Sequence, residues 1–303
     1  MMVTWNGGIT MSNGKKEWQD CYYICPGCKQ PLTPTINGLF CQQDGVEYPV
    51  KNEIPDFVVE DLTESPSLLL RSIDKLDNIA KIYEGSVYGA WDMVNAQLDL
   101  PSIKEMATIM TEAVDAENGV GLDVACGTGF ITRSIAQKMH LVYGIDISMG
   151  MLEKATEYAQ ERGIVNICFA RSRAERLPFP DTTFDGVTCS VALHLFPDTA
   201  EALREMARVM KTGARVAVLT LVKQDPSTLK MMQNAIKMVL ERVGTSSPFG
   251  EETPEALRIG EEVLGTQHLF DVKELERYLS QTGFRGFAYT IYGSFILFHA
   301  EKE

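Results

Sequence analysis

Residues 121–129 read Gly-Leu-Asp-Val-Ala-Cys-Gly-Thr-Gly, and this stretch decides the fold. The apolar run predicts a buried strand. Gly127 and Gly129 predict a tight turn whose backbone can approach a ligand closely. Apolar residues then recur at every fourth position from Ile131 to Met139, the spacing of one helical face. A strand, a glycine turn and a helix in succession are typical of nucleotide-binding α/β proteins.

Two carboxylates narrow the class of ligand. Asp123 precedes the turn, where its charge suits an ammonium group and would repel a pyrophosphate. Asp146 ends the apolar run 141–145, seventeen positions after Gly129, and is placed to accept hydrogen bonds from ribose hydroxyls. Thr132 stands where the dinucleotide fingerprint requires a third small residue. An ammonium, a ribose and no phosphate together describe S-adenosylmethionine.

Further segments carry a resemblance to a known family. Residues 143–148 read YGIDIS, and residues 173–198 read RAERLPFPDTTFDGVTCSVALHLFPD. With LDVACGTG at 122–129, they resemble the class I S-adenosylmethionine-dependent methyltransferases over roughly residues 67–303, in particular the ubiquinone/menaquinone-biosynthesis-like C-methyltransferases. The family usually has an aspartate before its Ala-Glu pair, where it accepts from the adenine amino group; this chain has Arg173 there.

The resemblance and the two carboxylates together imply a cofactor site for S-adenosylmethionine. The residues that we predict for it are Asp123, Ala125, Gly127, Gly129, Asp146, Ile147, Met151, Ala174, Glu175 and Ser190.

Three side chains are candidates for the chemistry itself. Methyl transfer is an in-line displacement, so positioning supplies much of the rate, and a base is needed only for an acceptor that is protonated in its reactive form. His194 follows the predicted strand 184–190 on the acceptor side and is either that base or a packed histidine. Tyr83 and Tyr88 either close the pocket or belong to the aromatic packing of a leading helix.

Residues 21–58 form a separate unit with clustered cysteines. Cys25-Pro-Gly-Cys28 is a C-x-x-C knuckle, and a hairpin is expected around Asn37-Gly38 before Cys41. The unit resembles the zinc-ribbon-like module that precedes some methyltransferases, among them rRNA guanine methyltransferases, although its fourth ligand position carries Asp44. The predicted set of zinc ligands is Cys25, Cys28, Cys41 and Asp44, with Cys21 as a substitute ligand. The alternative is a ribbon that has lost its metal.

The remaining order of elements predicts an α/β fold with a doubly wound, mostly parallel seven-stranded sheet, an antiparallel last strand, the small N-terminal β module and a helical insertion. Residues 1–20 are expected to be a flexible N-terminus, and residues 67–303 the methyltransferase domain. Predicted strands lie at 120–125, 141–145, 165–169, 184–190, 214–221, 284–291 and 294–300. Predicted helices lie at 67–83, 86–98, 102–115, 130–139, 149–162, 199–211 and 271–281. The insertion, residues 222–270, carries Met231, Met232 and Met238 and is either a lid over an apolar substrate or ordinary packing, including a dimer contact.

Composition bounds the partners and the compartment. The 303 residues are 45% apolar, without a run long enough to span a bilayer, and Met1–Asp20 lacks the apolar core of a signal peptide, so we expect a cytoplasmic protein. Cys126, Cys168 and Cys189 fall in predicted strands or the glycine turn and suit reduced core thiols. The net charge of −13 argues against nucleic acid as a partner. The sequence does not determine the oligomeric state.

Three functions are therefore open. The acidic balance and the family resemblance favour methyl transfer to a small, apolar or quinone-like molecule. The zinc-ribbon-like module suggests an rRNA or tRNA base methyltransferase instead. A non-catalytic binding partner with a cofactor fold is the third, motivated by Arg173 and Asp44.

Overall fold

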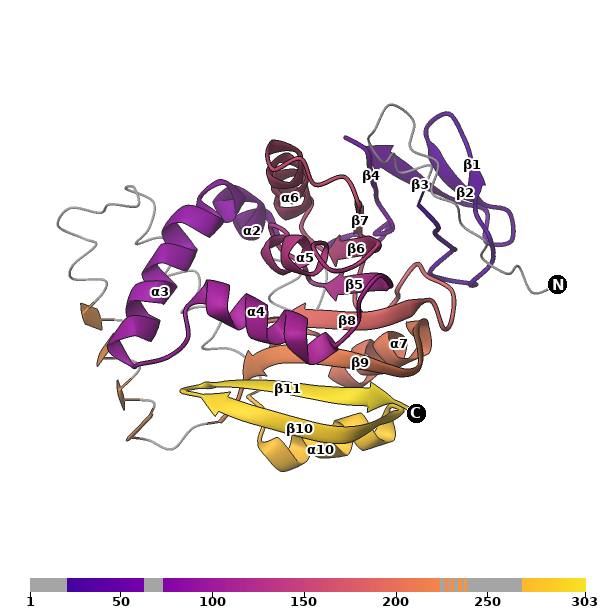
Figure 1. Ribbon diagram of the computed structural model, residues 1–303. Helices are drawn as coiled ribbons and strands as arrows, with labels where there is room; N and C mark the ends of the chain where they lie inside the picture. Colours follow the sequence, from indigo (N-terminus) through magenta and orange to yellow (C-terminus); the bar gives the residue numbers. More distant parts are fainter. Residues whose placement is uncertain are drawn as a thin grey trace.

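The computed structural model describes residues 21–62, 73–223 and 269–303, together with single residues between 227 and 238. In this part of the chain, a large sheet is covered by helices, and a small sheet lies beside β6 and β7 at one end of the molecule (Figure 1). The predicted α/β class with a doubly wound sheet is confirmed.

The large sheet has the strand order β10-β11-β9-β8-β5-β6-β7. Its strands are β5 (Val120–Val124), β6 (Leu141–Asp146), β7 (Ile167–Arg171), β8 (Phe184–Ser190), β9 (Met210–Leu221), β10 (Phe284–Tyr292) and β11 (Phe295–Lys302). Strands β5 to β9 run parallel, whereas β11 is antiparallel to both β9 and β10. The chain proceeds from β5 to β6 on one side and returns to β8 on the other, so a ligand crevice is expected at the carboxyl ends of β5 and β8.

Helices cover both faces of this sheet. One face carries α4 (Ile103–Val114), α5 (Phe130–Ile135) and α6 (Met149–Glu161), and the other carries α7 (Thr199–Val209) and α10 (Val272–Gln281). Ser148 and Asp198 cap α6 and α7 by accepting from backbone N–H groups one turn ahead. Helix α5 ends earlier than predicted, where the Asn166 amide donates to the carbonyls of Ala136 and Met139.

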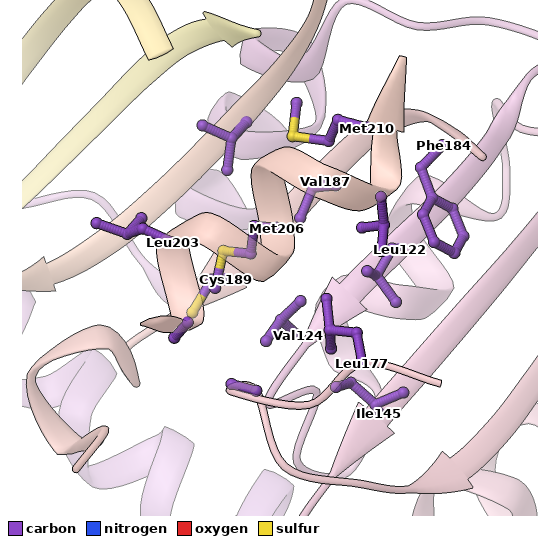
Figure 2. Packing of buried hydrophobic residues seen from close by; sticks show 14 of the residues in the cluster. Leu122, Val124, Ile145, Leu177, Phe184, Val187, Cys189, Leu203, Met206 and Met210 are labelled. Atoms are coloured by element: carbon purple, nitrogen blue, oxygen red, sulfur yellow. The ribbon is translucent and has the colours of Figure 1, made fainter. Parts of the chain in front are cut away.

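The core under α7 consists of buried apolar side chains of this helix and of the strands beneath it. Leu203 and Met206 of α7 lie over Leu122 of β5 and Val187 of β8, and all four are fully buried (Figure 2). Burying such side chains contributes about 1.5–3 kcal/mol each. This packing fixes the strand ends that carry the candidate site.

The N-terminal module is a small antiparallel sheet of β1 (Thr33–Pro34), β2 (Gly38–Cys41), β3 (Val46–Lys51) and β4 (Ile54–Pro55). The expected hairpin is present, and its turn runs from Thr35, whose N–H donates to the carbonyl of Gly38. The central residues are Ile36 and Asn37, one position before the predicted Asn37-Gly38 pair, because Gly38 already pairs with Pro49 in the sheet. The Thr35 hydroxyl accepts from the N–H groups of Asn37 and Gly38 and closes this turn instead.

The module shares its core with the large sheet. The Tyr23 ring packs against Tyr143 of β6 and against Phe179, with ring centroids 5.7 and 5.6 Å apart. Phe57 N–H donates to the carbonyl of Arg171 at the end of β7, at 2.9 Å. The connection from β7 to β8 contains no helix, so the aromatic side chains of the module cover this part of the sheet.

A disulfide joins Cys21 to Cys168 of β7, with the two Cα atoms 6.5 Å apart. The prediction of a reduced Cys168 is therefore wrong, and so is the use of Cys21 as a substitute metal ligand. The physical reason is that the module docks where β7 ends the sheet, which brings these distant cysteines together. The predicted thiols of Cys126 and Cys189 are free and buried.

A leading helical segment joins the module to the large sheet. It comprises α2 (Ile73–Ile79), the short turns η3 (Ala80–Ile82) and η4 (Tyr83–Val87), and α3 (Tyr88–Gln97). Most of the predicted insertion, with Met232, lies outside the described residues; Ala235 packs against Ala90 and Val94 of α3. Among the described residues, no helix has the length and apolarity that a bilayer crossing requires.

Candidate functional site

The glycine turn brings backbone to the end of β5. Ala125, Gly127 and Gly129 all have positive φ, at 56°, 53° and 78°. Glycine adopts this conformation freely, whereas alanine does so at a cost, which is typical of backbone held for a function. No atom would come within 4 Å of a Cβ on Gly127, so this residue faces open space.

Asp146 joins the glycine turn to the end of β6. One carboxylate oxygen accepts from Gly127 N–H at 2.8 Å and the other from Ser148 N–H at 2.9 Å. The side chain is buried, and burial raises its pKa. Each carboxylate oxygen can accept a further hydrogen bond, so Asp146 keeps capacity for a ligand hydroxyl.

Asp123 lies beneath the turn. Its two carboxylate oxygens accept hydrogen bonds from the hydroxyls of Thr132 and Thr188, at 2.6 and 2.7 Å, and Asp123 is 1% exposed. Burial raises the pKa of this carboxyl to about 6. Asp123 therefore fastens β5 to α5 and β8.

A cavity opens at the carboxyl ends of β5, β6, β7 and β8, where the topology expects one. Eight of the ten predicted cofactor residues line it, from four separate segments: Ala125, Gly127, Asp146, Ile147, Met151, Ala174, Glu175 and Ser190. Asp123 and Gly129 do not belong to the lining. Arg173, Val191 and Ala192, which sequence reasoning had already placed on the side of the cofactor, also line it. Sequence reasoning missed these lining residues: Ile145, Ser172, Leu195, Phe196 and Pro197. Most of them follow β7 or β8, a signal that could have identified them.

One wall of the cavity is apolar. It is formed by Val191, Ala192, Leu195, Phe196 and Pro197, which follow β8. Val191 has φ 54° and is 39% exposed, although a β-branched residue rarely adopts this conformation. Such strain costs about 1–3 kcal/mol and is typical of functional sites.

The three predicted catalytic side chains take different positions. Tyr83 lines the cavity, and burial together with the charge of Asp146 raises its pKa to about 12. Tyr88 does not line the cavity; it packs on Tyr83, with ring centroids 5.2 Å apart. His194 lies behind the apolar wall, 5% exposed, with Nδ1 3.0 Å from the Thr220 hydroxyl. Burial lowers its pKa to about 4, so the imidazole is neutral at pH 7.

The leading helical segment packs against the start of α6, beside the cavity. The Asp77 carboxylate accepts from Gly150 N–H at 2.9 Å and from the Ser148 hydroxyl. Met151 of α6 packs in turn against Ile79 and Val87. These contacts hold the segment that carries Tyr83 over the cavity.

A chain of charges borders the cavity where Glu175 lies. Arg173 Nε donates to Oε2 of Glu175 at 3.3 Å, and Nη1 donates to Oε1 of Glu60 at 3.2 Å. Glu60 follows the N-terminal module. Oε1 of Glu175 is buried and has no hydrogen-bond partner among the described residues.

A second cluster lies in the N-terminal module. The ligand atoms of Cys25, Cys28, Cys41 and Asp44 all lie within 4.8 Å of one another. Cys28 and Cys41 Sγ are 3.4 Å apart, and Cys25 Sγ is 3.1 Å from Asp44 Oδ2. Three thiolates and a carboxylate form a donor set that a tetrahedral Zn²⁺ accepts. The cluster lies apart from the cavity and has none of its lining residues.

Comparisons with known proteins agree with this architecture. YcgJ of Bacillus subtilis, an uncharacterised methyltransferase, is 40% identical over 107 residues, which are 35% of this chain and 42% of that protein. The ubiquinone/menaquinone biosynthesis C-methyltransferase UbiE of Proteus mirabilis is 34% identical over 179 residues, covering 56% of this chain and 70% of its own. The match thus spans less than half the length of the Bacillus relative.

A solved structure shares the fold. Geranyl diphosphate C-methyltransferase of Streptomyces coelicolor, solved with S-adenosyl-L-homocysteine, has a TM-score of 0.50 and 11% identity, covering 67% of this chain and 77% of that one. The family model of the ubiE/COQ5 methyltransferases matches residues 72–300. Since that match takes in most of the chain, the protein belongs to the ubiE/COQ5 methyltransferase family.

Proposed function

We propose that this protein transfers the methyl group of S-adenosylmethionine to a small, apolar, quinone-like acceptor. The observation that carries the proposal is the convergence of eight residues, predicted from sequence for this cofactor, on one cavity at the switch point of the sheet. When bound, the cofactor supplies a methyl group on a sulfonium leaving group. Asp146 would hold the ribose, and Gly127 would leave room for the amino-acid tail.

The apolar wall supports the nature of the acceptor. Val191, Leu195 and Phe196 offer an apolar surface to the cavity and would exclude water from the reacting atoms. Family membership and the activity named for the Proteus mirabilis relative agree with a quinone-like substrate.

Positioning carries the chemistry in this proposal. Tyr83 stays protonated at pH 7, because its pKa is about 12, and its hydroxyl can donate a hydrogen bond into the cavity. Tyr88 would support that ring from behind. His194 is neutral, outside the cavity lining and paired with Thr220, so its role is to hold the turn that carries Leu195.

We further propose that the N-terminal module holds a structural Zn²⁺ at Cys25, Cys28, Cys41 and Asp44. Its role would be confined to the stability of the module, since the cluster lies outside the cavity. A cytoplasmic location stays a prediction, which fractionation of cells would test.

The test is transfer of labelled methyl groups from S-adenosylmethionine, with reduced naphthoquinone and benzoquinone acceptors in one arm and unmodified ribosomal RNA in another. We expect label in the quinone fraction, and a large loss of it in Asp146→Ala. Incorporation into RNA alone would overturn the acceptor class. Failure of the wild-type protein to bind S-adenosylhomocysteine would overturn the cofactor as well.

A further inference from the structure

The side chain of Glu175 is buried without satisfying its hydrogen-bonding capacity. The side chain is 10% exposed, and Oε1 is the one buried side-chain oxygen or nitrogen without a partner in the described ranges 21–62, 73–223 and 269–303. An unsatisfied buried polar atom costs about 1–3 kcal/mol, more when it is charged, so it requires an explanation. Glu175 lines the cavity, which offers one.

The surroundings of Glu175 define the ligand group that would satisfy it. Ile147, Met151 and Ala174 line the same cavity with apolar surface. Ser172 N–H donates to the carbonyl of Asp146, which places the segment leading to Glu175 beside the proposed ribose site. A flat apolar ring with an N–H donor on its edge fits this combination, because the partnerless carboxylate oxygen Oε1 is a hydrogen-bond acceptor.

Arg173 fixes the orientation of the free oxygen. Its guanidinium engages Oε2 of Glu175 and Oε1 of Glu60, at 3.3 and 3.2 Å, so the carboxylate of Glu175 is held from one side. Glu60 belongs to the segment that follows the N-terminal module, and its neighbours Val58 and Leu62 pack toward Ile147.

We propose that Glu175 selects the 6-amino group of the cofactor's adenine through Oε1, with Arg173 and Glu60 as positioning residues. The inference rests on the proposed function. It makes the segment after the N-terminal module part of the cofactor site. Arg173 contacts both Glu175 and Glu60, so Arg173 and Glu60 act on the ligand through Glu175.

The test compares ligands that differ only at position 6 of the purine. Calorimetry would measure S-adenosylhomocysteine, its 6-oxo analogue S-inosylhomocysteine, and its N6,N6-dimethyl analogue. The wild type is expected to prefer the 6-amino ligand by roughly tenfold or more over either analogue, since the 6-oxo group would face a carboxylate and the dimethyl group has no N–H. The wild-type comparison needs no variant, so it stands even where a substitution fails to fold.

Glu175→Gln provides the sharper result. Its amide can donate to a 6-oxo group, so the preference for the 6-amino ligand should fall to within about threefold. Arg173→Ala should lower the preference, and Arg173→Lys should restore part of it, because a merely structural role would shift all three affinities together. Glu161→Gln, an exposed glutamate of α6 with the same change of charge, is the matched control and should keep the wild-type preference.

The outcomes separate the two proposals. Binding of S-adenosylhomocysteine with equal affinity for the 6-oxo analogue, or a Glu175→Gln variant that binds and keeps the wild-type preference, would overturn the role of Glu175 alone. Absence of binding of any of these ligands to the wild type would overturn the proposed function, and this inference with it.

Discussion

Arg133 and Glu84 form a buried ion pair that joins the leading helical segment to the glycine turn. Arg133 Nη2 donates to both carboxylate oxygens of Glu84, at 2.6 and 2.7 Å, and the two side chains are 6% and 10% exposed. Thr128 of the glycine turn donates its hydroxyl to Glu84, and its carbonyl accepts from Arg133. Glu84 follows Tyr83 in the π-turn η4, so this pair holds the tyrosine over the cavity.

Glu84→Ala should therefore be strongly destabilising. Removing one partner of a buried pair leaves an uncompensated charge, which costs about 3–5 kcal/mol. The free energy of unfolding in urea measures this loss. The matched control is Glu157→Ala, which breaks an exposed pair with Lys154 and should cost less than about 1 kcal/mol. Equal effects of the two substitutions would show that the Glu84 pair is not buried in solution.

Asp123 gives the protein a specific dependence of stability on pH. Its folded-state pKa of about 6 lies above the unfolded value of about 3.9, so the folded state binds the proton more tightly. The stabilisation that Asp123 adds to the free energy of unfolding is therefore complete below pH ~4 and declines as the pH rises to ~6. The total loss is roughly 3 kcal/mol, and the free energy is constant above that pH. His194 acts in the opposite sense, because its folded-state pKa is lowered to about 4.

The informative quantity is the difference between Asp123→Asn and the wild type. Asparagine has no charge to desolvate, and the hydroxyls of Thr132 and Thr188 can reorient toward its amide. We expect the variant to gain about 2–3 kcal/mol relative to the wild type as the pH rises from 4 to 7. Urea unfolding of the two proteins at several pH values measures this difference. Parallel profiles would contradict the raised pKa.

The sequence predicted the parts of the site that depend on local pattern. Gly127 and Asp146 follow apolar strands directly, and parallel strands bring their carboxyl ends to one edge, so the order of elements was enough to place them together. Caps such as Ser148 and Asp198 can be read from sequence, because a cap acts within one turn.

The parts that sequence reasoning missed depend on contacts between distant segments. The sequence shows that Arg173 replaces the aspartate usual in the family. Its partner Glu60, however, lies more than a hundred positions away, and nothing in the sequence between them predicts this ion pair. The contacts of Asp123 are a second example: a carboxylate at the end of a strand faces either a ligand or its neighbours, and its hydrogen bond with the hydroxyl of Thr188 depends on which strand lies beside it. His194 could not be distinguished from a base until its burial was known.

The metal cluster predicts one Zn²⁺ per chain in protein purified without chelator, measured by plasma mass spectrometry. Cys28→Ser should release the metal and destabilise the module, since a structural zinc contributes folding free energy directly. Asp44→Cys should bind zinc more tightly, because thiolate is the more usual structural ligand. Cys189→Ser, a buried thiol outside the cluster, should keep the metal. A wild-type protein that binds no added Zn²⁺ would show that the ribbon has lost its metal.

The disulfide between Cys21 and Cys168 is expected to hold the N-terminal module on the sheet. The two residues are 147 positions apart, so the bond closes a long loop in the unfolded chain, and its loss should cost about 3–5 kcal/mol. Non-reducing peptide mapping should recover the linked peptides, and reductant should lower the unfolding temperature of the wild type. Cys21→Ser should show the lower temperature already and respond no further to reductant. Free thiols at both Cys21 and Cys168 in protein purified under air would contradict the bond. Tyr23 and Phe57 would then hold the module by packing alone, through the aromatic contacts that cover β6 and β7.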